Sequence, residues 1–168
     1  DRQQLLDRAG RLSARTRFFL DLYWDIHEKW EQALAAENAV DFDDMLLRAA
    51  DVVEADPSLA RYDMILVDEF QDTSRARARL LKALLQGEGK YLLAVGDDWQ
   101  AINRFAGADL SVMTRFEEQF GPATTLHLQT TFRCTQTIAD VASAFVSRNP
   151  SQLPKVLRSA SAEQGAPV

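Results

Sequence analysis

The chain has 168 residues, 46% of them hydrophobic and 26% charged, so it is long enough to bury a core of its own. Its formal net charge of -6 argues against a free-standing nucleic-acid binder, because Lys and Arg supply phosphate contacts, but not against a part of one. The single cysteine, Cys134, excludes an internal disulfide, and without a membrane-length apolar run or a signal peptide the cytoplasm is the expected location.

The first third of the chain is predicted to be helical. Apolar residues recur every three or four positions from residue 2 to 36, and the broad aromatic face that includes Phe19 and Trp30 must pack against this chain or another domain. A second helix is expected over residues 42–55, with Asp41 as its cap. Its predicted buried face consists of Met45, Leu46, Ala49, Val52 and Val53.

Acidic residues follow an apolar run at residues 64–67, which predicts a parallel strand covered on both faces. Asp68 and Glu69 then lie at the carboxyl end of the strand, where open α/β sheets bind ligands. One carboxylate of such a pair can hold Mg²⁺, and its neighbour can activate the water that attacks a γ-phosphate. A solvated acidic turn is the alternative that these residues alone leave open.

The following elements predict a parallel crossover. A helix should begin at Thr73 or Ser74 and end at Gln86, and a second buried strand is expected over residues 91–95. The helix should turn Leu80, Leu81, Leu84 and Leu85 inward and leave Arg75, Arg77 and Arg79 on a solvated face.

Less regular structure is expected in the last third. A helix from Asp109 or Ser111 to Phe120 and a short strand over residues 124–128 are predicted, followed by a helix over 135–148. The first helix should bury Leu110, Met113, Phe116 and Phe120, and the last should bury Ile138, Val141, Ala142 and Phe145. From residue 149 onward, the prolines and small polar residues predict an extended or disordered tail.

Three strings then resemble motifs of one family, in the family's order. Residues 68–72 read DEFQD and resemble motif II of the UvrD/Rep group of superfamily 1 DNA helicases. Residues 95–109, VGDDWQAINRFAGAD, resemble motif III in wording similar to the helicase IV branch, and residues 128–133, LQTTFR, resemble motif IV.

The resemblance implies an α/β fold: part of a RecA-like (P-loop NTPase) three-layer domain with a parallel sheet, preceded by helices of the helical insertion. Residues 1–40 would belong to the insertion, 41–128 to the second half of the first motor domain, and 129–168 to the beginning of the second motor domain.

The resemblance also implies roles in an ATP-dependent, 3′-to-5′ translocase on single-stranded DNA. Asp68 and Glu69 would serve Mg²⁺, with Glu69 also activating water, and Gln100 would couple hydrolysis to movement. Arg133 would stabilise the transferring phosphate. ATP and Mg²⁺ are therefore the expected cofactors.

DNA contacts are implied for the motif III string. Phe105 could stack on a base, which contributes about 1–3 kcal/mol regardless of base identity, and Asn103 and Trp99 are further candidates. Trp99 can equally be a core residue beside the strand end. The chain departs from the family pattern at Asn103, Ala106 and Thr131, where an aromatic residue, an arginine and an asparagine are usual.

The phosphate cradle G-x-x-x-x-G-K-[ST] does not occur in the sequence. We therefore expect an internal fragment that is inactive alone, whose partners are single-stranded DNA or duplex junctions and the remaining helicase domains, without a membrane. A helicase subunit of a recombination nuclease and a non-catalytic interaction module on a degenerate helicase core are the alternatives.

Overall fold

The computed structural model describes residues 14–161 of the chain. The chain divides into two compact units, one ending at Met45 and the other beginning at Leu46. The division falls within helix α3 (Phe42–Ala55), a few residues beyond the predicted boundary at residue 40. The predicted boundary between residues 128 and 129 lies inside the second unit and stays a prediction.

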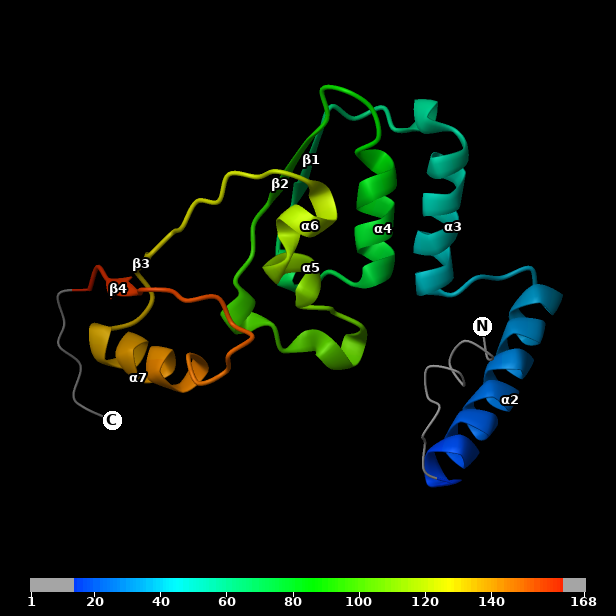
Figure 1. The fold of residues 1–168 in the computed structure, drawn as a ribbon, viewed down its shortest axis with the longest axis horizontal. Coiled ribbons are helices and arrows are strands. Elements are labelled where there is room, and N and C mark those ends of the chain that lie inside the picture. Colours follow the sequence, from blue (N-terminus) through cyan, green and yellow to red (C-terminus); the bar gives the residue numbers. More distant parts are fainter. Residues whose placement is uncertain (1–13, 162–168) are drawn as a thin grey trace. The chain divides into compact units, whose positions relative to one another are not determined.

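Helix α2 (Ala14–Ala36) dominates the first unit (Figure 1). It ends where the sequence predicted, and the predicted beginning at residue 2 lies outside the described residues. No residue of α2 is buried, so the aromatic face that includes Phe19 and Trp30 stays open to solvent. Of the helices that the structure describes, none combines the length and the apolar character needed to cross a membrane.

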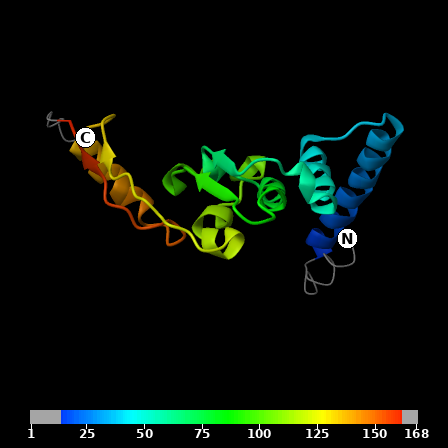
Figure 2. The same ribbon diagram turned by 90° about the horizontal axis from the view of Figure 1, so that it is seen from above.

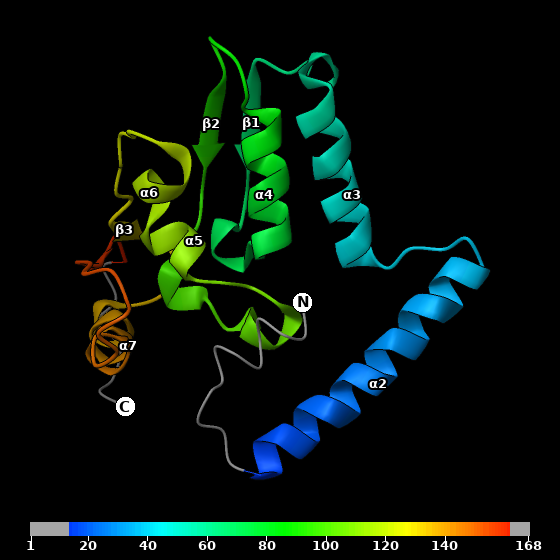
Figure 3. The ribbon, with the colours of Figure 1, turned by 45° about the vertical axis from the view of Figure 1, so that its right-hand side comes forward.

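Two parallel strands form the centre of the second unit. Strands β1 (Met64–Val67) and β2 (Tyr91–Ala94) pair in parallel, and helix α4 (Arg75–Leu84) connects them, which confirms the predicted strand, helix and strand. The hydroxyl of Ser74 accepts a hydrogen bond from the Arg77 N–H, which caps the first turn of α4. Helix α4 lies between the strands and α3 (Figure 3).

Only one face of this small sheet is covered, and the prediction of a strand covered on both faces is wrong for the described residues. Side chains alternate across a strand, and half-buried Val67 and Ala94 pack toward the core whereas Leu66 and Leu93 are exposed. The same exposed face carries Met64 and Tyr91. A four-residue apolar run therefore indicated a strand but not what covers it.

Phe70 is the centre of the core beneath the sheet. Its buried ring lies edge-on to the rings of Phe116 and Phe120, with centroids 5.5 and 5.9 Å apart. These two rings lie on α6 (Phe116–Phe120), which follows α5 (Ser111–Thr114). A single helix was predicted here, and it divides in two because Arg115 leaves the helical conformation, with φ -118° and ψ 41°.

A second apolar cluster joins α3 to α4. Its buried members are alanines and one valine, contributed by both helices and by the turn after the 3-10 helix η1 (Pro57–Leu59): Ala50, Val53, Ala60 and Ala83. The predicted burial of Met45 and Val52 is wrong, since both are exposed. Within the described residues α3 buries only Ala50 and Val53, so the buried stripe is narrower than its apolar pattern indicated.

The predicted strand over residues 124–128 does not form, and Leu126 and Leu128 are exposed. A strand needs a hydrogen-bonded neighbour, and these residues pair with no described segment. The chain instead makes β3 (Thr130–Thr131), which pairs in parallel with β4 (Arg158–Ser159).

Helix α7 (Gln136–Val146) lies between β3 and β4 in sequence and beside them in space (Figure 2). It buries Ala139 alone among its residues, and the predicted inward positions Ile138, Val141, Ala142 and Phe145 are exposed. Beyond α7 the chain is mostly extended, as predicted, but it is hydrogen-bonded through β4 and not a free tail.

Candidate functional site

The candidate site lies where β1 and β2 end, in residues 68–73 and 96–100, which we call the strand-end junction. The Phe70 N–H donates a hydrogen bond of 2.9 Å to the Val95 carbonyl, so the two chain segments stay in contact beyond the paired strands. Gly96 allows this approach. A Cβ atom there would lie 2.8 Å from Gln71 Oε1, a distance that real Cβ atoms essentially never show, and a tight 3.0 Å from the Phe70 nitrogen.

Asp68 and Glu69 follow β1 directly and are exposed, which fits both the predicted ligand-binding edge and the alternative of a solvated acidic turn. The Glu69 N–H donates to Asp68 Oδ1 at 2.9 Å. Glu69 has φ 48° and ψ 46°, a left-handed backbone conformation that costs a residue with a Cβ about 1–2 kcal/mol. At this residue the chain turns into the 3-10 helix η2 (Phe70–Asp72), so that Asp68 and Glu69 are exposed while Phe70 is buried.

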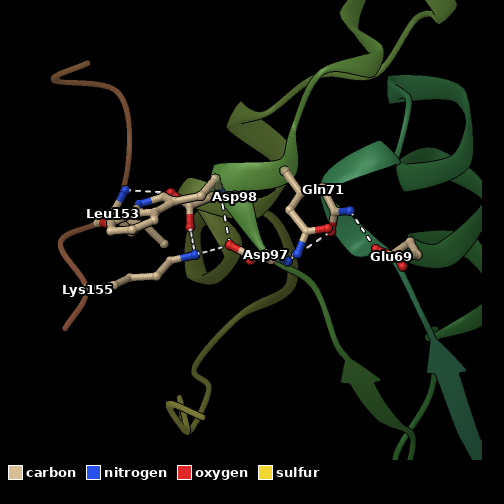
Figure 4. Close-up of polar contacts among 8 residues, drawn as sticks. Glu69, Gln71, Asp97, Asp98, Leu153 and Lys155 are labelled. Atoms are coloured by element: carbon tan, nitrogen blue, oxygen red, sulfur yellow. Dashed lines mark hydrogen bonds and ion pairs between the residues drawn. The ribbon is translucent and has the colours of Figure 1, made fainter. Parts of the chain in front are cut away.

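Gln71 joins the two halves of the junction, and sequence reasoning assigned it no role. Its side chain is 3% exposed. Its Nε2 donates to Glu69 Oε2 at 2.7 Å, and its Oε1 accepts from the Asp97 N–H at 2.9 Å (Figure 4). The available signal was its place inside the DEFQD string, because a buried amide in an acidic turn must find both a donor and an acceptor.

Gln100 ends the 3-10 helix η3 (Asp98–Gln100) and is held by Asp97. Its Nε2 donates to Asp97 Oδ2 at 2.8 Å, and the Trp99 N–H donates to Oδ1 of the same carboxylate. Although partial burial raises the pKa of Asp97, hydrogen bonds from Lys155 and Gln100 hold it below its ordinary value. Asp97 is therefore charged at neutral pH and connects Gln100, through Gln71, to Glu69.

Asp98, next in sequence, is fully buried at the same strand end. Its Oδ2 accepts from the Leu153 N–H at 2.6 Å, and its Oδ1 lies 2.5 Å from Lys155 Nζ. Trp99 is half-buried and donates its ring N–H to the Leu153 carbonyl at 3.1 Å. The sequence carried no signal for Leu153 or Lys155, which lie more than fifty residues further along the chain.

Two of the three predicted DNA contacts make side-chain hydrogen bonds to other described residues, and the third is an exposed aromatic ring. Trp99 is bonded to Leu153, and Asn103 Nδ2 donates to Asp72 Oδ2 at 2.8 Å. Phe105, in the 3-10 helix η4 (Asn103–Ala106), is 89% exposed. Of the three, Phe105 is therefore the one whose ring is available to stack on a base.

Arg133 follows β3 and is exposed. Its backbone N–H donates to Thr131 Oγ1 at 3.3 Å, and its guanidinium forms no ion pair with any residue of the described range. The structure does not bring Arg133 into contact with Asp68 or Glu69. Its predicted role in stabilising a transferring phosphate stays a prediction.

The fit of Mg²⁺ and ATP to this junction follows from its donor set. Mg²⁺ is bound in phosphoryl-transfer sites through one or two carboxylates, with phosphate oxygens and water completing the shell. Asp68 and Glu69 offer such carboxylates, and no cluster of three or more metal-ligating side chains occurs within residues 14–161. The residues therefore suit a metal that arrives with a phosphate ligand, and no described residue forms a phosphate cradle.

Comparison of the sequence with known proteins identifies its family. Residues 2–121 match the model of the UvrD/REP helicase N-terminal domain. The chain is 48% identical over 131 residues to DNA helicase IV of Escherichia coli (strain K12), covering 77% of this chain and 19% of that protein. It is 30% identical over 161 residues to the ATP-dependent DNA helicase PcrA of Staphylococcus aureus, covering 93% of this chain and 22% of that protein.

PcrA of Leuconostoc citreum is similar to the same extent, 30% identical over 161 residues and 93% of this chain. The chain spans about a fifth of the length of each of these relatives. The matched residues contain both halves of the strand-end junction, with Asp68, Glu69 and Gln100 among them. The chain belongs to the UvrD/REP helicase family, in which it matches the N-terminal domain.

Proposed function

We propose that this chain supplies the metal-binding and water-activating part of the ATP site in an ATP-dependent DNA helicase that moves 3′ to 5′ on single-stranded DNA. One observation carries the proposal: the polar network from Glu69 through Gln71 and Asp97 to Gln100 at the ends of two parallel strands. Such strand ends are where α/β sheets bind nucleotides. The relatives named above are helicases, and PcrA is named as ATP-dependent.

Each residue of the network has a definite task under this proposal. Asp68 would hold Mg²⁺, whose charge neutralises the phosphate oxygens during transfer. Glu69 would accept a proton from the attacking water. The hydrogen bond from Gln71 Nε2 would set the orientation of the Glu69 carboxylate. Gln100 lies beyond the second strand end, where it would respond to the γ-phosphate and pass that response to the 3-10 helices that carry Trp99 and Phe105.

The arrangement also defines what other parts of the protein would provide. The fold described would be part of a RecA-like motor domain, and the exposed sheet face with Leu66 and Leu93 would pack against the rest of that domain. The phosphate cradle would lie there too. Arg133, open to solvent, would meet the nucleotide from a second motor domain. Residues 1–168 alone are therefore expected to be inactive.

The test is Glu69→Gln in the full-length protein, with Glu88→Gln as the matched control because Glu88 is an exposed acid remote from the junction in the loop before β2. Loss of the general base should lower kcat for DNA-stimulated ATP hydrolysis by about 10²–10⁴-fold. Nucleotide affinity and the affinity for single-stranded DNA should remain. A Glu69→Gln protein that hydrolyses ATP as fast as the Glu88→Gln protein would overturn the proposed role of the junction.

One observation favours a second candidate, a non-catalytic interaction module. Asn103 and Trp99, two of the residues matched to DNA contacts, are bonded to Asp72 and Leu153 within the chain. In that case the wild-type full-length protein would bind partners without hydrolysing ATP. A helicase subunit of a recombination nuclease would hydrolyse ATP as proposed, and a nuclease assay on the full-length protein would identify it.

A further inference from the structure

Residues 149–159, here called the return segment, leave the end of α7 and come back to the strand-end junction. Leu153 makes a reciprocal pair of hydrogen bonds there, donating its N–H to Asp98 Oδ2 at 2.6 Å and accepting from Trp99 Nε1 at 3.1 Å (Figure 4). Asp98 is fully buried beneath this contact. The return segment therefore forms part of the junction and not a loose connection.

Lys155 contacts three consecutive residues of the junction at once. Its ammonium hydrogen-bonds to Asp97 Oδ1, lies 2.5 Å from Asp98 Oδ1 and is 5.2 Å from the centre of the Trp99 ring. Apart from this ion pair, Asp98 Oδ1 has no hydrogen-bond partner among the described residues. The Lys155 side chain is 19% exposed, and its ammonium lies between the buried carboxylate of Asp98 and the carboxylate of Asp97, whose side chain is 41% exposed.

Asp97 links Lys155 to Gln100, because its carboxylate accepts a hydrogen bond from each of them. Asp97 receives Lys155 and the Trp99 N–H on Oδ1 and Gln100 on Oδ2, so both oxygens are occupied and the carboxylate has little freedom to turn. Without the ammonium, two neighbouring carboxylates would repel each other, and Asp98 would be a buried charge without a countercharge. Asp97 would then reorient, and Gln100 would lose its fixed partner.

The return segment also reaches the strand that precedes Arg133. Three residues after Lys155, Arg158 begins β4, which pairs with Thr130 and Thr131 of β3. Arg133 follows two residues later. The return segment is therefore hydrogen-bonded at one end to the residues just before Gln100 and at the other end to the strand just before Arg133.

We propose that Lys155 is a positioning residue for ATP hydrolysis, which holds Gln100 in place through Asp97 and anchors the return segment that links Gln100 to the Arg133 segment. This inference rests on the proposed function. In this role Lys155 would act through Asp97 and would not itself contact the nucleotide or the metal. Its loss should therefore slow turnover without weakening ATP binding.

The experiment compares full-length proteins carrying Lys155→Met, Lys155→Arg and Lys82→Met. Lys82 is the matched control because it also makes one hydrogen bond, 2.6 Å to Gln119 Oε1, away from the junction. We expect Lys155→Met to lower kcat for DNA-stimulated ATP hydrolysis by about ten- to a hundredfold, the cost of a small misplacement near reacting groups. KM for ATP should stay near the wild-type value, Lys155→Arg should recover most of the loss, and Lys82→Met should match wild type.

A double-mutant cycle identifies the path of the effect. If Lys155 acts through Asp97, the protein with Lys155→Met and Asp97→Asn together should be no slower than the slower of the two single variants. Additive losses would overturn the positioning path. Should Lys155→Met prove too unstable to purify, Lys155→Gln removes the charge and keeps a donor, and the same comparison with Lys155→Arg applies.

The possible failures are distinguishable. If wild type hydrolyses ATP and Glu69→Gln does not, a Lys155→Met protein with wild-type kcat overturns the role of Lys155 and leaves the proposed function standing. A Lys155→Met protein whose activity falls only in proportion to its folded fraction likewise overturns it, because a purely structural ion pair would behave in that way. A wild-type protein without ATPase activity overturns both proposals.

Discussion

The strand-end junction and the segment around Arg133 both carry residues that resemble helicase motifs, yet their side chains differ in how far they are bonded to other described residues. In the junction, Gln71 and Asp98 are buried and every described polar side chain discussed above has a partner. Around Arg133, the neighbouring Leu128 and Phe132 are 92% and 83% exposed, and the guanidinium has no ion-pair partner among the described residues.

The difference shows which of the candidate residues have side-chain partners among the described residues. Glu69 and Gln100 make side-chain hydrogen bonds to Gln71 and Asp97, and Asp68 accepts one from the Glu69 N–H. Among the described residues, Arg133 makes a backbone hydrogen bond to Thr131 Oγ1 and its guanidinium has no ion-pair partner. We infer that the junction is preorganised and that Arg133 acquires its role from groups brought to it by a nucleotide or by another domain.

The largest effect is expected from replacing Arg133, the exposed candidate residue. Arg133→Ala in the full-length protein should lower kcat for ATP hydrolysis by about 10³-fold or more, because an arginine that stabilises transferring phosphate carries that much of the rate. Its free energy of unfolding should change by less than about 0.5 kcal/mol, since an exposed side chain without partners contributes little. Steady-state kinetics and thermal unfolding measure the two quantities.

Arg148→Ala is the control for that variant, since Arg148 is also exposed, just beyond the end of α7. It should leave both quantities unchanged. Equal ATPase rates for the two variants would show that the match of Arg133 to motif IV carries no catalytic role in this protein.

A smaller effect is expected from a substitution in the strand-end junction. Gly96→Ala places a Cβ atom 2.8 Å from Gln71 Oε1 and 3.0 Å from the Phe70 nitrogen. Overpacking of this kind should cost about 1–3 kcal/mol of stability, and displacement of Gln71 should also lower kcat. Chemical denaturation and ATPase assays on the same preparation would measure both.

Gly89→Ala separates these two effects. Gly89 has φ 73° and nothing within 4 Å of a Cβ atom, so alanine strains the backbone there without reaching the junction. We expect a loss of stability with unchanged kcat per folded molecule. If Gly89→Ala lowered kcat as much as Gly96→Ala, stability alone would explain both, and the contact between Gly96 and Gln71 would not be what activity requires.

The smallest expected effect tests the edge of the junction. Asp109 accepts from Ser111 N–H and Oγ and from Arg75 Nε, and the hydrogen bonds from Ser111 and Arg75 lower its pKa to about 2. Asp109→Asn should cost about 1–2 kcal/mol at neutral pH, the value of a hydrogen bond to a charged group reduced for partial exposure.

The pH dependence of that loss has a definite sign. Because folding lowers the pKa of Asp109 from 3.8 to about 2, its contribution is complete above the unfolded value and is lost as the pH falls toward the folded value. The stability difference between wild type and Asp109→Asn should therefore narrow between about pH 4 and about pH 2. A constant difference across that window would mean that the charge of Asp109 is not what stabilises the fold.

Sequence patterns succeeded where local rules dominate. The helix after Ser74 and the two parallel strands on either side of it were predicted, because capping, β-branched runs and breaks by glycine act over a few residues. They failed where burial depends on neighbours. Val52 and Phe145 sit at apolar helical positions yet are exposed, since no described segment covers them.

The amino-acid sequence by itself determined the order of the helices and strands from α3 to β2, the family and the candidate residues at the two strand ends. Only the tertiary structure brought Leu153 and Lys155 to Asp98, because contacts between residues more than fifty positions apart leave no periodic signal in the chain. It also decided that Asn103 and Trp99 are bonded within the chain whereas Phe105 is open. Periodicity and turn chemistry act locally, but a side chain's partners depend on how the whole chain packs.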